Sequence, residues 1–370
     1  MNSDSAFAIA VATGTDDAAW GRLALACAER IGEPTGARLG FVYASDRFAG
    51  HLGDIAALLR RTTGIADWVG SVAAGIVAGS EEIVDRPAIA AMVVPFAPST
   101  YRLIASLDAP PQAPATPPPA GGLAIVHADP RNPQLAAIIE GLARVEASFV
   151  VGGLTVSRGS HDQVAGAASE GGVSGVWLAP DIALSVGLSQ GCSPIGPVRR
   201  ITGGTENVVF EIDGRPALDV LKQDVGELLA RRLDRVAGYI HAAFPVAGSD
   251  TGDYLVRNLV GIDRQRNWIA VGERVETGQA IRFVRRDRAA AEEDLVCMLT
   301  RLKRRLGAPP RAALYHTCIA RGASLFGGPS QEIAIVQREL GVVPIVGMFC
   351  NGEISNARLY GYTAVLTAFA

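Results

Sequence analysis

The chain has 370 residues, of which 49% are apolar and 19% charged, and its formal net charge is −3 at pH 7. This apolar content excludes a disordered chain, and the near-neutral charge gives no general attraction to nucleic acid or to an anionic membrane. At roughly 150 residues per domain we expect two or three domains. No stretch reaches the ~18 apolar residues that a membrane-spanning helix needs, so we expect a soluble protein.

The five cysteines are far apart in the sequence, which argues against a disulfide framework and against a CxxC zinc site. Free cysteines are typical of proteins in a reducing compartment. The apolar run near the N-terminus, Ala6–Ala12, is too short for a secretory signal and has no basic residues before it. We therefore expect a cytoplasmic protein with reduced thiols.

Short, continuous apolar runs alternate with helical patterns in the N-terminal part of the chain. Such runs are typical of strands in sheets that are covered on both faces. Strands are predicted at Ala6–Ala12, Leu39–Tyr43, Ile89–Val94, Leu123–His127, Phe149–Leu154, Gly175–Leu178 and Ile182–Leu188, and helices at Trp20–Ile31, Ile55–Thr63 and Pro133–Arg144. The segment Ala109–Gly122 carries six prolines and no charge, which predicts an extended linker or loop.

The C-terminal part continues the same alternation. A helix is expected after Asp287, because acidic residues lie near its start and basic residues near its end, as the helix dipole favours. The other elements are strands at Asn207–Ile212, Ala312–Thr317, Val342–Phe349 and Leu359–Phe369, and helices after Pro216 and at Ser330–Leu340. We expect an α/β fold of two related halves with layered mixed sheets covered by helices, an N-terminal domain over residues 1–220 and a C-terminal domain over residues 221–370.

Two distant segments share one layout, which indicates an internal duplication. In Gly40–Val77 and in Ala312–Ile354, a strand, a polar loop, a helix and a second strand precede a glycine turn. The turns GSVAAGIV and GMFCNGEI place their glycines five residues apart, and GCSPIGPV at Gly191–Val198 repeats this spacing. Glycine lets a ligand or another backbone approach closely. We therefore expect the matched turns to line equivalent places in the two halves.

Reactive side chains gather at two predicted strand ends. His316 and Cys318 lie two residues apart, so they point to the same side of their strand, and Cys350 ends the next strand. Three interpretations stay open: core packing of the cysteines, an ion pair between Arg321 and Glu353, and a thiol nucleophile with His316 as its base. Because the His-x-Cys pair supplies only two ligands, no metal site is expected. The other histidines are isolated, and any of them could ligate a haem iron.

Four segments resemble the FIST domain family. Gly187–Leu221 resembles the end of an N-terminal FIST domain, and Tyr254–Asp287 resembles the start of a C-terminal FIST domain. His316–Gly327 and Val346–Leu366 look like the final motifs of that domain. The resemblance implies a sensory module that binds a small ligand, with amino acids proposed as ligands. Some members of the family are haem-containing nitric oxide sensors, so haem is a further expectation of the resemblance.

The matching motif positions imply a set of ligand-binding residues. They are Gln190, Gly191, Cys192, Arg257, Cys318, Arg321, Gly322, Cys350, Asn351, Gly352 and Glu353. The first glycine turn departs from the family pattern, because Ile76 stands where the family often has an acidic residue. The N-terminal half of the site is therefore expected to be degenerate.

These observations predict a stand-alone bacterial FIST protein that binds a small polar, amino-acid-like metabolite at glycine turns between the two halves. Arg321 and Glu353 are the expected charged anchors, and no resident cofactor is expected. The alternatives are a haem-based nitric oxide sensor and a thiol-dependent hydrolase or transferase that uses Cys350 or Cys318. No part of the sequence reads as a kinase, methyl-acceptor or F-box module, so any output must pass through a separate signalling partner or through catalysis.

Overall fold

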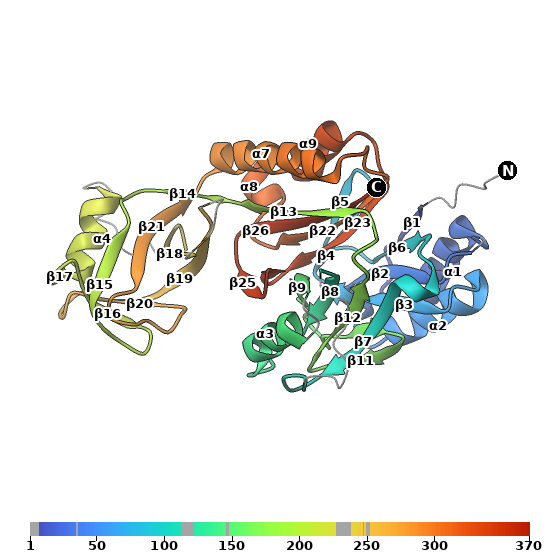
Figure 1. Ribbon diagram of the computed structural model, residues 1–370, viewed down its shortest axis with the longest axis horizontal. Coiled ribbons are helices and arrows are strands. Elements are labelled where there is room, and N and C mark those ends of the chain that lie inside the picture. Colours follow the sequence, from blue (N-terminus) through green and yellow to red (C-terminus); the bar gives the residue numbers. More distant parts are fainter. Residues whose placement is uncertain are drawn as a thin grey trace. The chain divides into compact units, whose positions relative to one another are not determined.

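The computed structural model describes residues 7–34, 36–112, 121–145, 148–226, 238–246, 248 and 252–370. The chain divides into two compact units, a larger one from residues 1–190 and 292–370 and a smaller one from residues 191–291 (Figure 1). The predicted α/β class with mixed sheets and covering helices is confirmed. The boundary between an N-terminal and a C-terminal domain expected at residue 220 stays a prediction. The compact units are a different division, which separates the chain after Gln190 and after Ala291. No described helix is long and apolar enough to cross a membrane.

Three six-stranded sheets make up the described β-structure of the larger unit. The first contains, in order, β1 (Ala8–Thr13), β6 (Ala88–Val94), β2 (Leu39–Ser45), β3 (Asp67–Ala73), β10 (Gln163–Ala165) and β11 (Ala167–Ser169). The second contains β7 (Tyr101–Leu107), β12 (Val173–Leu178), β8 (Leu123–Ala128), β9 (Phe149–Leu154), β24 (Glu353–Ser355) and β25 (Arg358–Tyr360). The third contains β13 (Leu184–Gln190), β26 (Thr363–Phe369), β22 (Ala312–Cys318), β23 (Ile345–Cys350), β4 (Gly75–Ala78) and β5 (Glu81–Val84).

The common order of these sheets reveals a threefold repeat. Each sheet has a central parallel pair, which is β2–β3, β8–β9 or β22–β23. On the side of the first strand of this pair, two more strands follow, and each is antiparallel to the strand before it. A hairpin from another repeat extends the second member: β10–β11 pairs with β3, β24–β25 with β9, and β4–β5 with β23. Each repeat thus completes the sheet of a neighbouring repeat. The predicted duplication is therefore part of a triplication, whose additional copy lies between the two segments recognised in the sequence.

One glycine occupies the same place in all three repeats. Gly70, Gly152 and Gly347 lie where the exchanged hairpin pairs with the parallel strands. A Cβ atom at these positions would lie 1.7, 1.8 and 1.8 Å from a backbone oxygen of the neighbouring strand. The third glycine spacing predicted from the sequence, at Gly191–Val198, is not a copy of this feature, because that segment lies in the smaller unit at β14 (Cys192–Pro194).

Helices cover the outer faces of the three sheets. Figure 1 shows α1 (Trp20–Ile31) and α2 (Leu52–Thr63) beside the first sheet, and α3 (Leu135–Val145) beside the second. The third carries α7 (Arg288–Leu306), α8 (Ala323–Phe326) and α9 (Gln331–Leu340). As expected from the sequence, Asp287 caps α7: its carboxylate accepts a hydrogen bond from the amide of Ala290 at 3.0 Å.

Alternate residues of the central strands face in opposite directions, which gives each sheet an inner and an outer face. Phe41 and Tyr43 of β2 belong to a core cluster that contains residues from all three sheets, whereas Val42 and Ala44 pack with residues of α1 and α2. The inner faces of the three sheets therefore share one apolar core. Continuous apolar strands are explained by this arrangement, since both faces are buried.

The described part of the smaller unit consists of an antiparallel sheet and the helix α4, which packs against it. Its strands are β14, β15 (Arg199–Thr205), β16 (Val208–Ile212), β17 (Arg215–Pro216), β18 (Ile240–Pro245), β19 (Tyr254–Asp263), β20 (Trp268–Val271) and β21 (Ala280–Arg286). The helix α4 (Ala217–Val225) buries Leu218 and Leu221 in the core of this unit. The strand and the helix predicted around Pro216 are both present.

The predicted proline-rich linker joins β7 to β8 within the larger unit. Residues 113–120 of this segment lie outside the described residues. Both neighbouring strands belong to the second sheet, so the segment connects two strands of the larger unit and does not join the two compact units.

Candidate functional site

Three polar aromatic side chains meet in the core shared by the three sheets. Tyr43, His127 and His316 occupy the same position in their repeats, each opposite the residue that follows the repeated glycine. The hydroxyl of Tyr43 lies 3.2 Å from Nε2 of His316 and 3.1 Å from Nε2 of His127. All three residues are fully buried. Neither Tyr43 nor His127 was singled out from the sequence, because the repeat that relates them was not recognised there.

This cluster is a neutral hydrogen-bond network. Burial lowers the pKa of His316 to about 4, and burial together with the neighbouring His316 holds the pKa of His127 well below its usual range. The hydroxyl of Tyr43 has one proton, so it donates to one imidazole and accepts from the other. His316 is thus engaged by Tyr43, and its low pKa makes it a poor base for a neighbouring thiol.

Replacing Tyr43 by phenylalanine should destabilise the larger unit by about 1–3 kcal/mol, because one buried imidazole N–H loses its acceptor. The free energy of unfolding in urea measures this loss. Tyr101→Phe is the matched control, because Tyr101 donates to Asp67 at 2.9 Å and is only partly buried, so water can replace its bond. If both variants lose the same free energy of unfolding, the buried network contributes no more to stability than a partly exposed hydrogen bond does.

The cysteines at the strand ends are protonated thiols. Cys318 and Cys350 lie opposite each other on the parallel strands β22 and β23. Burial, with a contribution from Glu353, raises the pKa of Cys318 to about 12 and that of Cys350 well above its usual range. Because the thiolate is the reactive form, these surroundings favour core packing over nucleophilic catalysis.

Glu353 is a buried carboxyl group with one unpartnered oxygen. Its Oε2 accepts hydrogen bonds from the Thr363 hydroxyl at 2.7 Å and from the Thr363 amide at 3.3 Å, whereas Oε1 has no partner. Burial raises the pKa of Glu353 to about 8, so the group is protonated at neutral pH. Ile76 and Gln163 occupy the same position in the other two hairpins. Ile76, which departs from the family pattern in the first glycine turn, therefore occupies the position that Glu353 has in the second glycine turn.

Arg321 pairs with Glu332, and the ion pair with Glu353 that the sequence left open is not the one formed. Its Nε lies 2.7 Å from Oε1 of Glu332, and both side chains are fully buried. Its two other nitrogens lie 3.5 Å from the carbonyl oxygen of Tyr362 and from the hydroxyl of Ser189. All three guanidinium nitrogens therefore have acceptors within the protein.

Glu332 collects several donors from the strand and loop before it. Tyr315 donates its hydroxyl to Oε1 at 2.6 Å, and the amide of Gly322 donates to Oε2 at 3.1 Å. The hydroxyl of Thr317 lies 3.2 Å from Oε2. Because these bonds satisfy a carboxylate, Glu332 is a fixed counter-ion for Arg321. No sequence pattern distinguished Glu332, which lies at an ordinary position in the first turn of α9.

A pocket of about 310 Å³ lies beside this buried ion pair. The hairpin β4–β5 contributes Gly75, Glu82 and Val84 to its lining, and the segment after β22 contributes Ile319, Arg321, Ala323 and Ser324. Phe349, from the second glycine turn, lines it as well. Residues from both of the matched turns therefore meet at one pocket within the larger unit.

Glu82 is the carboxyl group in the lining of this pocket. Its oxygens accept hydrogen bonds from the amides of Ser330 and Ile333, at 3.2 and 3.1 Å, where α9 begins. Burial and the nearby Glu332 raise the pKa of Glu82 to about 7. Sequence reasoning missed this residue, since nothing in the spacing distinguishes it from its exposed neighbour Glu81.

The ligand-binding residues implied by the resemblance divide between the two compact units. The larger unit contains Gln190, Cys318, Arg321, Gly322, Cys350, Asn351, Gly352 and Glu353, and the smaller one Gly191, Cys192 and Arg257. In the smaller unit, Arg257 pairs with Glu273 at 2.7 Å. In the larger unit, the amide of Gln190 donates to Asp294 at 2.6 Å. The role of these residues in binding a ligand remains a prediction.

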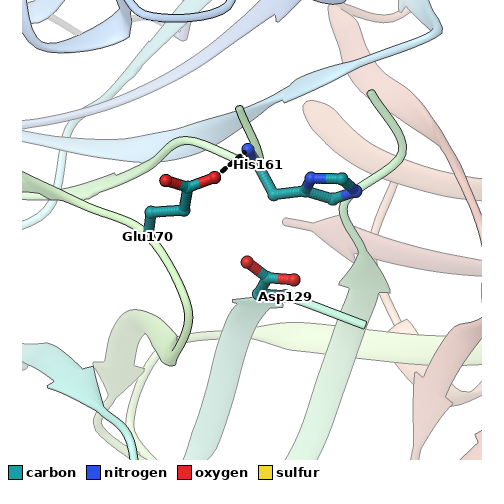
Figure 2. Close-up of side chains that lie close together, drawn as sticks. All are labelled: Asp129, His161 and Glu170. Atoms are coloured by element: carbon teal, nitrogen blue, oxygen red, sulfur yellow. Dashed lines mark hydrogen bonds between the residues drawn. The ribbon is translucent and has the colours of Figure 1, made fainter. Parts of the chain in front are cut away.

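A second cluster has the residue types of a metal site. Figure 2 shows Asp129, His161 and Glu170, whose potential ligand atoms lie within 4.8 Å of one another. The guanidinium of Arg131 already bridges the carboxylates, at 2.6 Å from Asp129 and 2.5 Å from Glu170. The dashed line in Figure 2 is a further bond, from the amide of His161 to Glu170. Arg131 thus supplies the positive charge that a metal ion would bring, so we interpret the cluster as an ion-pair network.

Comparison with known protein families matches residues 38–215 to the FIST N domain and residues 217–356 to the FIST C domain. An uncharacterized protein of Mycobacterium tuberculosis is 35% identical over 209 residues, which is 54% of this chain and 54% of that protein. An uncharacterized protein of Mycobacterium bovis is 33% identical over 191 residues, or 49% of each chain. The match therefore spans about half the length of these curated relatives.

Proposed function

This chain belongs to the FIST family, and from that premise we propose that it is a sensory protein that binds a small, amino-acid-like metabolite in the pocket of the larger unit. FIST domains are generally regarded as small-ligand-binding domains of signal transduction. The volume of about 310 Å³ is at the lower end of the range typical of small-molecule sites. A metabolite of amino-acid size suits a pocket of these dimensions.

One observation carries the proposal: the pocket lies between segments from the two family domains. Gly75 and Glu82 belong to the part matched by the N domain, and Ile319 and Phe349 to the part matched by the C domain. The hairpin that bears Gly75 is held there by its pairing with β23. A bound ligand would contact both segments, so its binding energy could stabilise one arrangement of the hairpin over another. This is the property that a sensor needs.

The haem alternative finds no support at this pocket. A haem iron needs an axial ligand such as histidine, cysteine, methionine or tyrosine, and the residues that line the pocket include none of these. His127 and His316 are engaged by Tyr43 in the core. The thiol-hydrolase alternative is weakened by the raised pKa values of Cys318 and Cys350.

Ala323→Phe should abolish ligand binding, because Ala323 is exposed at the pocket and a phenyl ring there would fill it. Native mass spectrometry of the purified protein, followed by thermal-shift titration with the ligand that it identifies, measures this loss. We expect affinity to fall by at least about tenfold. Ala137→Phe, at an exposed position of α3, is the matched control and should retain the ligand. Equal retention by both variants would contradict the assignment of this pocket.

A further inference from the structure

We infer that the pocket of the larger unit takes a ligand with an apolar body and a cationic amine, and that Glu82 receives the amine. This inference rests on the proposed function, because it names the ligand class of the same pocket. It also changes the recognition expected from the sequence, in which Arg321 and Glu353 are the charged anchors of the ligand.

Arg321 is not available to a ligand anion. It is among the residues that line the pocket, but its side chain is fully buried and lies against Glu332, Tyr362 and Ser189. Opening this arrangement would leave Glu332 as a buried charge without its counter-ion, which is strongly unfavourable. A ligand carboxylate would have to repay that cost to reach the guanidinium.

The free charge in the lining of the pocket is the carboxyl group of Glu82. Arg321 also lines the pocket, but it is already paired with the fully buried Glu332. Glu353 is fully buried and holds its proton near neutral pH. An entering cation would therefore meet the Glu82 carboxylate, whereas an entering anion would find the one guanidinium already neutralised.

Glu82 is oriented to accept an ammonium group. The amides of Ser330 and Ile333 each donate to a different oxygen of its carboxylate, which fixes the group at the start of α9. A carboxylate oxygen can accept two hydrogen bonds, so each oxygen of Glu82 can accept one more. Burial and Glu332 disfavour the charged form of Glu82, and its raised pKa of about 7 agrees with this. A cation bound next to Glu82 would favour the charged form of its carboxyl group and so offset the effect of burial and of Glu332.

The rim of the pocket is apolar. Val84 and Ile319 are among the few large apolar side chains exposed on the described surface, at 50% and 46%, and both line the pocket. Phe349 and Pro329 extend the same apolar lining. The polar residues of the lining are Glu82, Arg321 and Ser324, and a few polar groups among apolar side chains are typical of a site in which they set the orientation of the ligand. The ligand body that fits this surface is a short aliphatic or aromatic group.

Three probes with one carbon skeleton test the inference: 3-methylbutylamine, 3-methylbutanol and 3-methylbutanoate, each titrated at pH 7.5–8 by calorimetry. We expect the amine to bind at least about tenfold more tightly than the carboxylate, with the alcohol between them. Ala323→Phe should abolish binding of all three. A carboxylate that binds as tightly as the amine would overturn the inference, as would the absence of amine binding at millimolar concentration.

Glu82→Gln should weaken amine binding at least about tenfold while leaving the alcohol unchanged. Glu81→Gln is the matched control, because Glu81 is exposed and pairs with Arg86 outside the pocket. An amine affinity that is equal in the two variants would overturn the role of Glu82. If Glu82→Gln does not fold, the preference of the unaltered protein for amine over carboxylate still decides the inference. If the protein prefers the carboxylate probe and Ala323→Phe abolishes its binding, the ligand class inferred here is wrong, but the pocket remains the ligand site of the proposed function.

Discussion

Gly347→Ala is expected to prevent the larger unit from folding, at a cost above about 4 kcal/mol. The added Cβ would lie 1.8 Å from the backbone oxygen of Tyr315, where real Cβ atoms stay beyond 3.0 Å. The conflict is with backbone, so no side-chain rotation relieves it. Strands β22 and β23 would have to separate, which breaks the parallel pairing between Ala313–Cys318 and Ile345–Cys350.

Gly21→Ala is the control for this prediction. Gly21 lies in helix α1, and a Cβ there would meet no atom within 4 Å. Alanine should stabilise the helix by about 0.5–1 kcal/mol, because it loses less backbone entropy on folding. The yield of soluble protein and the thermal unfolding curve distinguish the two variants. A cooperative transition for Gly347→Ala near that of the wild type would contradict the close packing at the repeated glycine.

The same glycine explains why the sequence predicted a duplication and the structure contains a triplication. Gly70 and Gly347 are each followed by a second glycine five residues later, at the start of the hairpin. After Gly152 the chain instead runs through Thr155–Asp162 before β10 begins, so the spacing is lost. A loop of different length leaves the strand pairing intact, because loop length is only a small entropic term. Sequence spacing is therefore a poorer guide to this repeat than strand register.

The central strands were predictable because their burial depends on local composition. Runs such as Ile89–Val94 and Leu123–His127 are apolar throughout, and the structure buries both faces of these strands. The exchanged hairpins were less accessible to sequence reasoning. Strands such as Gln163–Ala165 and Glu353–Ser355 have only three residues, and their pairing partners belong to other repeats.

The candidate site was also predictable from the sequence only in part. The sequence placed Cys318 and Cys350 at the ends of two strands without showing whether these strands are neighbours, and the structure pairs them in β22 and β23. The charge balance could not be predicted, because it depends on Glu82 and Glu332, which reach Arg321 from the hairpin β4–β5 and from α9. An arginine in a motif suggests an anion site, but its counter-ion decides whether that charge is available to a ligand.

The stability of the larger unit should fall as the pH rises from about 6.5 to about 8.5, and Glu353→Gln should flatten this dependence. The pKa of Glu353 is about 8 in the folded protein, against an ordinary value of 4.5. Between these values the folded state holds a proton that the unfolded state has released, so stability is lost as the pH rises through the folded pKa. Between about pH 6.5 and pH 8 this change is on the order of 2 kcal/mol. At lower pH the buried His127 and His316, whose pKa values are lowered, add a change of the opposite sign.

Gln163 indicates that an amide fits at this position, since it occupies the equivalent place in another hairpin and is fully buried. Glu353→Gln should therefore fold, and at about pH 8.5 it should be more stable than the wild type, because it never has to ionise in the core. Urea unfolding at about pH 6.5, 7.5 and 8.5 compares the two proteins. Some slope should persist in the variant, since the pKa of Glu82 is raised to about 7 and adds a change of the same sign. A wild-type stability that is constant or increases over this interval would mean that Glu353 is ionised in the folded state, and that its charge is balanced by a group other than Arg321.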